Sequence, residues 1–192
     1  KLGIKNIYNQ DLLDVNLPEH YFDVVTLWHV IEHLPDPLGT LKRINRLLKE
    51  DGVLIIECPN FDSLSRIVFR DKWFPLFLPR HFYQFTPQIL KRMLEISGLM
   101  IEEVNYKIIP PMNTVLLKLS FLQWLGLHRP LEESGGGREK ATLSVKKRSI
   151  LWISVRELLN LGCFIISIIL ALLKRGDDIC IFAKKYSKER VV

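Results

Sequence analysis

The residues best suited to chemistry are His29, Glu32 and His33, which lie in the stretch FDVVTLWHVIEHLPDP. The H-x-x-E-H spacing is typical of a group of zinc hydrolases, in which two imidazoles on one helix face bind the metal and the glutamate activates a metal-bound water. Such a site needs a stable helix and a third ligand downstream. Here Pro35 and Pro37 directly follow the motif, so at most a turn or two of helix can form. The spacing alone therefore does not assign a zinc site.

The segments around the motif predict an α/β fold. FDVVTLWHV is β-branched and nearly continuous in apolar residues, which is typical of a strand buried on both faces of a parallel sheet. Asp36-Pro37 predicts the start of a helix that ends at Glu50-Asp51-Gly52, and GVLIIECPN predicts a second buried strand. A strand, a helix and a strand in succession form a βαβ unit. The motif then lies at the carboxyl end of a parallel strand, where open α/β sheets bind their ligands.

Further elements are predicted on both sides of this unit. IKNIYNQDLLDV predicts a strand that is followed by a loop at NLPEHY. Thr86-Pro87 predicts a helix that ends at Gly98, LMIEEVNYKII predicts another strand, and DDICIFAKK predicts a short last strand. Residues 73–85 are rich in aromatic side chains, and this stretch is either a lid over an apolar acceptor or ordinary core.

The net charge of +6 and a pI near 9.3 raise the question of a nucleic-acid partner. The basic residues are scattered apart from three clusters, two of which, Lys146 to Arg148 and Lys174-Arg175, bracket an apolar segment. This arrangement suits an anionic membrane surface better than a duplex, so no nucleic-acid partner is expected. The three cysteines are widely spaced and form no C-x-x-C pair, which favours a reduced, cytosolic compartment.

A hydrophobic helical insert is predicted at residues 111–175, between a first part at residues 1–110 and a last strand and tail at residues 176–192. Within it, Leu158 to Leu173 is free of charged residues, and its length lies between those of a buried helix and a membrane span. A span would leave the last strand on the far side of the membrane, away from its sheet. An interfacial or re-entrant helix on the inner face of the membrane avoids this problem. The alternatives are an oligomer interface and a helix packed on the domain.

The stretch FDVVTLWHVIEHLPDPLGTLKRINRLLKEDGVLIIECPN resembles the central βαβ unit of class I S-adenosylmethionine-dependent methyltransferases, in particular the ubiquinone-pathway O-methyltransferase branch. That family has a Phe-Asp strand start, a Glu-His-Leu/Val turn and a Leu-Lys-x-Gly-Gly turn. The last of these corresponds to Leu48 to Gly52 here, with a departure at one position. RHFYQFTPQILKRMLEISGL resembles the family's downstream helix. The resemblance covers Leu2 to Lys107 and implies a Rossmann-like class I methyltransferase fold with the insert before its last strand.

Two family features have no counterpart in this sequence. They are the glycine-rich loop after the family's first strand and the acidic residue after its second strand. No G-x-G-x-G occurs, and the glycine run from Gly135 to Gly137 lies among polar residues as a linker would. The chain is therefore expected to be the C-terminal part of a methyltransferase domain, incomplete at its N-terminus, that binds the cofactor poorly alone.

The resemblance also implies residues that contact S-adenosylmethionine. Asp11 matches the position that accepts a hydrogen bond from the adenine amino group, and Leu12 matches a position alongside the ring. Leu27, Trp28 and His29 match positions that line the methionine part of the cofactor. The alternatives are that Asp11 caps a turn and that Trp28 is a core aromatic residue.

The catalytic candidates are His33 and His81, either of which can accept the proton of an acceptor hydroxyl. For His81 the alternative is a loop histidine packed among aromatic rings. Glu32 and His33 also match an acidic-x-x-Glu-His set that is thought to hold a divalent metal in some quinone O-methyltransferases. His29 replaces the first acid of that set, so no metal ligands are assigned and a divalent cation stays an alternative beside S-adenosylmethionine.

The function predicted from these features is methyl transfer from S-adenosylmethionine to an oxygen of a small or lipid-linked acceptor, by an enzyme attached peripherally to the inner face of the membrane. A sugar or a lipid-linked saccharide is a second class of acceptor. The rival prediction is a noncatalytic membrane-associated α/β module that has lost cofactor binding.

Overall fold

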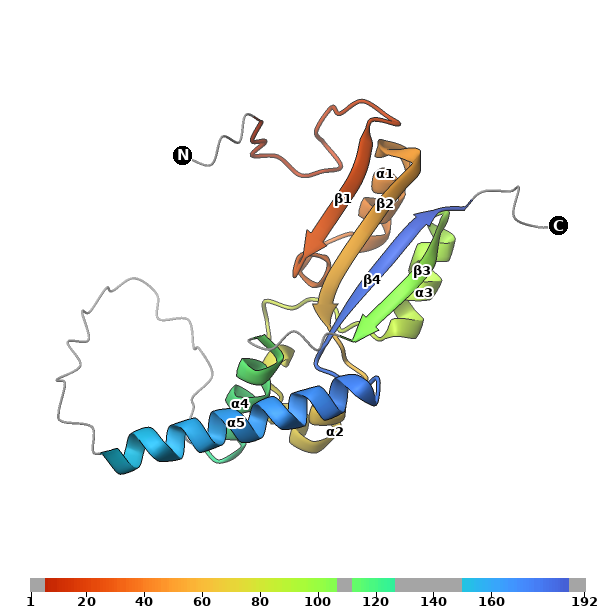
Figure 1. The fold of residues 1–192 in the computed structure, drawn as a ribbon. Helices are drawn as coiled ribbons and strands as arrows, with labels where there is room; N and C mark the ends of the chain where they lie inside the picture. The colour runs from red at the N-terminus through yellow and green to blue at the C-terminus, as the bar shows by residue number, and fades with distance from the viewer. Residues whose placement is uncertain (1–5, 107–111, 127–149, 187–192) are drawn as a thin grey trace. The chain divides into compact units, whose positions relative to one another are not determined.

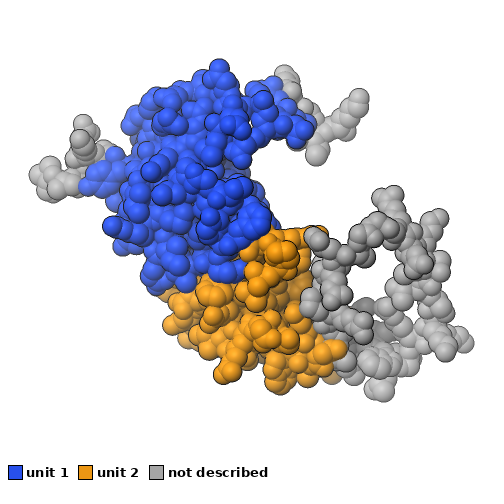
Figure 2. All heavy atoms as spheres, turned by 180° about the vertical axis from the view of Figure 1, so that it is seen from behind, with its two compact units in different colours: residues 1–58, 82–105, 179–192 blue, residues 59–81, 106–178 orange. Residues whose placement is uncertain are grey.

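The computed structural model describes residues 6–106, 112–126 and 150–186 and consists of two compact units (Figure 2). The first unit comprises residues 1–58, 82–105 and 179–192, and the second comprises residues 59–81 and 106–178. The second unit therefore joins residues 59–81 to the segment that was predicted as an insert.

A four-stranded sheet with two helices forms the first unit (Figure 1). The sheet order is β1-β2-β4-β3, and β1 pairs with β2 in parallel. Figure 1 shows that β4 runs opposite to its neighbours and that both helices lie on the same face of the sheet. The predicted βαβ unit and the last strand are thus confirmed. The elements are β1 (Phe22–Trp28), α1 (Pro37–Leu47), β2 (Leu48–Pro59), α3 (Pro87–Ile96), β3 (Leu99–Tyr106) and β4 (Asp178–Lys185).

Both helices begin at the predicted caps. The Asp36 carboxylate accepts a hydrogen bond from the Gly39 backbone N–H at 2.8 Å, and the Thr86 hydroxyl accepts one from the Ile89 N–H at 3.2 Å. Each cap satisfies one of the backbone donors that a helix start leaves unpaired. Gly98 follows α3 with a φ of +77°, a conformation that favours glycine.

Two local predictions about this unit are wrong. The helix α1 ends at Leu47 rather than at residues 50–52, because β2 begins at once and is bulged: Phe22 pairs with Leu48, but Val24 pairs with Val53. The described part of IKNIYNQDLLDV, residues 6–15, contains no strand. In the sheet that the structure describes, β1 is an edge strand, and this segment does not pair with it.

The prediction that β1 is buried on both faces is also wrong. Leu27 is buried, whereas Val24 and Trp28 on the alternate face are 51% and 50% exposed. Successive side chains of a strand point to opposite faces, and among the described elements of this unit the two helices cover only one of them. One row of β1 side chains therefore faces solvent.

The second unit is mostly helical. Its helices are α2 (Leu64–Phe69), α4 (Met112–Trp124) and α5 (Ile150–Leu172), and two 3-10 turns lie at Arg70–Lys72 and Phe74–Leu76. No helix within the described residues is long and apolar enough to cross a bilayer.

The buried carboxylate of Asp177 accepts hydrogen bonds from two side chains of the second unit. Its Oδ1 accepts a hydrogen bond from Trp73 Nε1 at 2.8 Å and another from the Ser65 hydroxyl. Trp73 is fully buried, so this part of the aromatic stretch is core. Burial raises the pKa of the Asp177 carboxyl, and the hydrogen bonds from Ser65 and Trp73 act in the opposite direction.

Replacing Asp177 by Asn should remove a pH dependence of folding. Because burial raises the folded-state pKa above the ordinary value of about 3.9, the folded chain binds more protons than the unfolded chain between the two pKa values. We expect the wild type to lose stability relative to D177N as the pH rises through that window, as measured by urea unfolding.

The control is Asp71, an exposed acid of the same unit whose pKa is lowered by Lys72. The stability of the wild type relative to D71N should change in the opposite sense: it should decrease as the pH falls. A difference between the wild type and D177N that does not vary with pH would contradict the account.

Candidate functional site

The candidate site lies at the carboxyl end of β1. Here His29 donates its backbone N–H to the Glu57 carbonyl at 2.8 Å, which extends the pairing with β2 by one residue. His29 itself has a φ of +50°, a left-handed conformation that costs a residue other than glycine about 1–2 kcal/mol. The chain then forms a 3-10 turn at Ile31–His33. The contacts around His29 must stabilise its left-handed conformation. Strained backbone of this kind is concentrated at functional sites.

The imidazole of His29 lies between two acidic side chains. Its Nδ1 is 3.3 Å from Glu32 Oε1 and its Nε2 is 3.4 Å from Glu57 Oε1. The Glu32 side chain is 1% exposed, whereas that of His29 is 32% exposed. Nδ1 can donate a hydrogen bond to Glu32 Oε1, and Nε2 lies close to Glu57 without forming a hydrogen bond to it, so the imidazole is held in one orientation with an edge at the surface.

Glu32 retains one unpaired atom. Its Oε2 is buried and has no hydrogen-bond partner among the described residues. A buried carboxylate oxygen without a donor is costly, and such an atom in a native structure calls for an explanation. A bound ligand that brings a hydrogen-bond donor or a positive charge to this end of β1 would satisfy it.

The H-x-x-E-H motif does not form the helix that a zinc hydrolase requires. The segment contains only the three-residue turn Ile31–His33, and the His33 N–H bonds to the Val30 carbonyl. The two histidines therefore do not share a helix face, and the side chain of His29 contacts Glu32 instead.

Asp11 and Leu12 lie in an irregular segment of the first unit. Asp11 is exposed, and its Oδ1 accepts a hydrogen bond from the Leu13 N–H at 2.9 Å. Its carbonyl accepts another from the Val15 N–H at 3.1 Å. The carboxylate thus caps a turn, and its contact with adenine stays a prediction. Leu12 is half-buried.

The two histidines predicted to accept a proton lie in different units. His33 is half-buried in the first unit. His81 is buried in the second unit, where its Nδ1 is 2.7 Å from the Pro75 carbonyl oxygen and its ring packs against Phe77. Because a carbonyl only accepts, Nδ1 carries a ring proton, and in the neutral ring the lone pair is on Nε2. This tautomer is the one that a general base needs if Nε2 faces the substrate.

Glu57 is the member of the site that the sequence analysis missed. It lies inside the apolar stretch LIIECP of β2, opposite Trp28 in the sheet register. A charged residue within a buried strand is unusual. The position of Glu57 in an apolar stretch could therefore have marked it as a candidate site residue.

The comparisons with known proteins agree with this fold. The profile of a family described as "Methyltransferase domain" matches residues 4–104. A "Ubiquinone biosynthesis O-methyltransferase" from Nitrosospira multiformis is 31% identical over 91 residues, which is 44% of this chain and 38% of that protein. The protein of the same name from Haemophilus ducreyi is 49% identical over 39 residues, covering 20% of this chain and 16% of that protein.

Among solved structures, the chain is similar to a "SAM dependent methyltransferase" from Archaeoglobus fulgidus, with a TM-score of 0.51 and 24% identity over 96% of this chain and 69% of that one. This likeness supports the Rossmann-like α/β fold. The chain belongs to the methyltransferase domain family, because the family profile covers more than half of it. The matches to the curated relatives span well under two thirds of those proteins.

The contact between His29 and Glu32 can be tested by a double-mutant cycle. Replacing His29 by Gln should lower the free energy of unfolding by about 1–3 kcal/mol, because it leaves a buried carboxylate without its partner. Adding Glu32→Gln should restore most of that loss. Urea unfolding of the four proteins gives the coupling energy.

His20 provides a matched control. It also has a positive φ, of 53°, and its Nδ1 lies 3.2 Å from Glu50 Oε1, but both side chains are largely exposed. H20Q should therefore leave stability nearly unchanged. Equal effects of H20Q and H29Q would show that the buried contact has no special role.

Proposed function

We propose that the chain is part of an S-adenosylmethionine-dependent methyltransferase that methylates an oxygen of a small or lipid-linked acceptor. The observation that supports this most is the family match over residues 4–104, a range that contains the whole cluster at the end of β1. The relatives named "Ubiquinone biosynthesis O-methyltransferase" support oxygen as the methylated atom. A sugar or a lipid-linked saccharide is the second class of acceptor. The proposal includes no metal.

The residues at the end of β1 fit this cofactor. S-adenosylmethionine is positively charged at its sulfonium and amino groups, and the site includes the buried carboxylates of Glu32 and Glu57, of which Glu32 Oε2 has no donor among the described residues. Trp28 is half-exposed on one face of β1, and Leu27 is buried on the other. These side chains, together with His29, would line the methionine part of the cofactor, and Asp11 and Leu12 would contact its adenine.

The chain's own part in the reaction is positioning and proton transfer. When bound, S-adenosylmethionine supplies an electrophilic methyl group. The contacts of His29 with Glu32 and Glu57 hold one wall of the site rigid, so that the acceptor oxygen can be kept in line with the methyl group. The proton of the acceptor hydroxyl passes to a histidine nitrogen, His33 or Nε2 of His81, as the new bond from oxygen to carbon forms and S-adenosylhomocysteine leaves.

We also propose a peripheral attachment to the inner face of the membrane. The residues Leu158, Leu161, Ile165, Ile169 and Leu172 recur at helical spacing on α5 and are all exposed. Lys174 and Arg175 follow directly and are exposed as well. An apolar helix face beside cations matches the surface of an anionic membrane.

The proposed adenine contact predicts a specific loss of cofactor affinity. Replacing Asp11 by Asn preserves an oxygen for the Leu13 N–H but removes the charge. A hydrogen bond to a charged group contributes about 1.5–3 kcal/mol. We therefore expect D11N to weaken S-adenosylmethionine binding at least roughly tenfold, as measured by calorimetric titration of the protein encoded by the full reading frame.

Asp14, an exposed acid in the same turn, is the control, and D14N should bind as the wild type does. If D11N bound S-adenosylmethionine as tightly as the wild type does, Asp11 would have no role in the cofactor site and would only cap the turn. If the wild type itself does not bind, the noncatalytic α/β module becomes the better account of the chain.

The proposed base predicts a loss of rate. We expect H33Q or H81Q to lower methyl transfer by a factor of roughly 10² or more. The assay is transfer of a labelled methyl group into the organic-soluble fraction of a total lipid extract. The exposed His20 serves as control, and full activity in both H33Q and H81Q would rule out a histidine base.

A further inference from the structure

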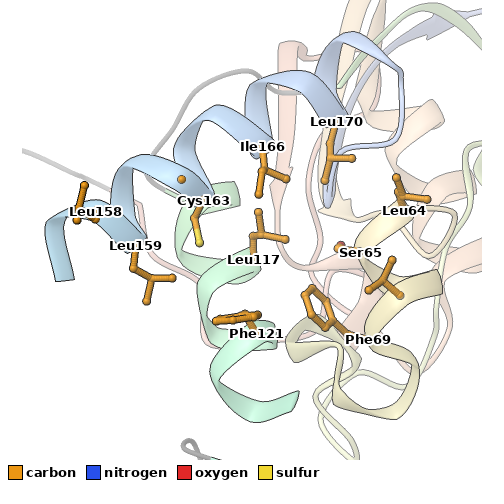
Figure 3. Close-up of a pocket in the computed structure, with 12 residues that line it drawn as sticks. Leu64, Ser65, Phe69, Leu117, Phe121, Leu158, Leu159, Cys163, Ile166 and Leu170 are labelled. Atoms are coloured by element: carbon orange, nitrogen blue, oxygen red, sulfur yellow. The ribbon is translucent and has the colours of Figure 1, made fainter. Parts of the chain in front are cut away.

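The second unit contains a groove between α2, α4 and α5 (Figure 3). Its volume is about 350 Å³, which falls within the range of roughly 300–1,000 Å³ that ligand pockets occupy. Figure 3 shows Leu117 and Phe121 of α4 and Phe69 of α2 directed into the space below α5, with Ile166 and Leu170 of α5 above it. The walls of the groove are therefore apolar.

The few polar side chains of the described lining provide neither a free hydroxyl proton nor a charge for a polar ligand. The hydroxyl of Ser65 already donates its proton to Asp177. The Cys163 thiol is buried, and burial raises its pKa, so it stays neutral. A ligand in the groove would have to consist of hydrocarbon, because any polar group there would lose its hydrogen bonds to water without replacement.

The groove opens to the surface along one side. Leu64, Val68 and Leu158 line it and are each exposed. An extended chain can therefore enter sideways, and its end can leave the groove into solvent. This shape suits a single hydrocarbon chain better than a compact, fully enclosed ligand.

The other face of α2 is basic. Arg66 and Arg70 line a second hollow, of about 510 Å³, in which the Arg66 guanidinium lies 4.1 Å from the centre of the Phe61 ring. Neither arginine forms an ion pair with another residue in the part of the chain that the structure describes. Asp71, the acid that lines this hollow, pairs with Lys72 at 2.8 Å. The hollow therefore holds two cationic side chains and one acid, Asp71, whose pKa is lowered mainly by Lys72 and to a lesser extent by Arg70.

We propose that the second unit binds one anionic amphiphile, with its single hydrocarbon chain in the groove and its phosphate or carboxylate against Arg66 and Arg70. Val68 lines the groove and its neighbour Ile67 lines the second hollow, and both side chains are exposed, so one ligand can pass from the groove to the hollow across this part of α2. The inference goes beyond the proposed function and does not depend on methyl transfer. It is also distinct from attachment to a bilayer, because it requires one molecule in one site.

The first test uses alkyl phosphates below their micelle concentration. Hexyl, octyl and decyl phosphate are titrated calorimetrically into the full chain. Each methylene that enters the groove should raise the affinity about fourfold. Binding with a stoichiometry of one and this dependence on chain length supports the site. Affinity that does not change with chain length, or binding only to vesicles that contain the amphiphile, would overturn it.

Gly162 provides a variant that fills the groove without disturbing the fold. It lines the groove, and a Cβ atom added there would meet no other atom within 4 Å. Leucine is also a better helix former than glycine. We expect G162L to unfold at the same temperature as the wild type or higher, and to bind decyl phosphate at least tenfold more weakly.

The matched control is Leu161→Gln on the same helix. Leu161 is exposed and does not line the groove, so L161Q should weaken binding to vesicles of anionic lipid but leave decyl phosphate affinity unchanged. Wild-type affinity in folded G162L, or equal losses in G162L and L161Q, would contradict the proposed site.

The position of the anionic group is tested separately. R66Q and R70Q should each lower the affinity for decyl phosphate roughly tenfold at low salt and leave the affinity for decanol unchanged. Arg92 of α3, an exposed arginine of the first unit, is the control. If decanol binds the wild type as tightly as decyl phosphate does, the two arginines have no part in the site.

Discussion

The parallel pairing of β1 with β2 is the interaction on which the candidate site depends. The register sets Trp28 opposite Glu57, and the next residue, His29, donates its N–H to the Glu57 carbonyl. With His29 in a left-handed backbone conformation, its side chain lies beside Glu57, and the 3-10 turn that follows brings Glu32 to its other nitrogen. A shift of the register by one residue would move each of these side chains to the opposite face.

The side chains of His29, Glu32 and Glu57 stabilise one another only when all three are present. Two buried carboxylates repel each other, and each is costly to remove from water. The imidazole between them offsets part of that cost, and the contacts in turn hold His29 in a backbone conformation that a residue other than glycine seldom adopts. The oxygen of Glu32 that lacks a donor is the part of the cost that the described residues do not offset. A binding site can tolerate such an atom because the ligand supplies the missing partner.

Much of this structure was predictable from local signals. Asp36 and Thr86 cap helices where their positions before proline indicated, and the apolar runs of β1 and β2 pair in parallel as expected. The predictions that were wrong depend on contacts between segments that are distant in the sequence, and a local pattern does not determine such contacts. The apolar run of β1 does not indicate that Val24 and Trp28 face solvent, because exposure depends on which elements cover the sheet. The strand expected near Ile7 and Tyr8 does not form, since no described strand pairs with this segment and both residues are exposed.

The candidate site was only partly predictable for the same reason. The resemblance directed attention to the residues that follow β1, including His29, but Glu57 becomes a member of the site only through the pairing of the two strands. Likewise, Trp73 was predicted as part of a lid or of the core, and its hydrogen bond to Asp177 is what identifies it as core. Asp177 lies more than a hundred residues away in the sequence, so no local pattern could have joined them.

A crystal structure of the protein with S-adenosylhomocysteine would test the central claim most directly. The account predicts the ligand at the carboxyl end of β1, with its amino-acid part against Leu27, Trp28 and His29, and with a donor group within hydrogen-bond distance of Glu32 Oε2. Density for the ligand at any other place, or a Glu32 Oε2 that stays without a donor when the ligand is bound, would contradict it.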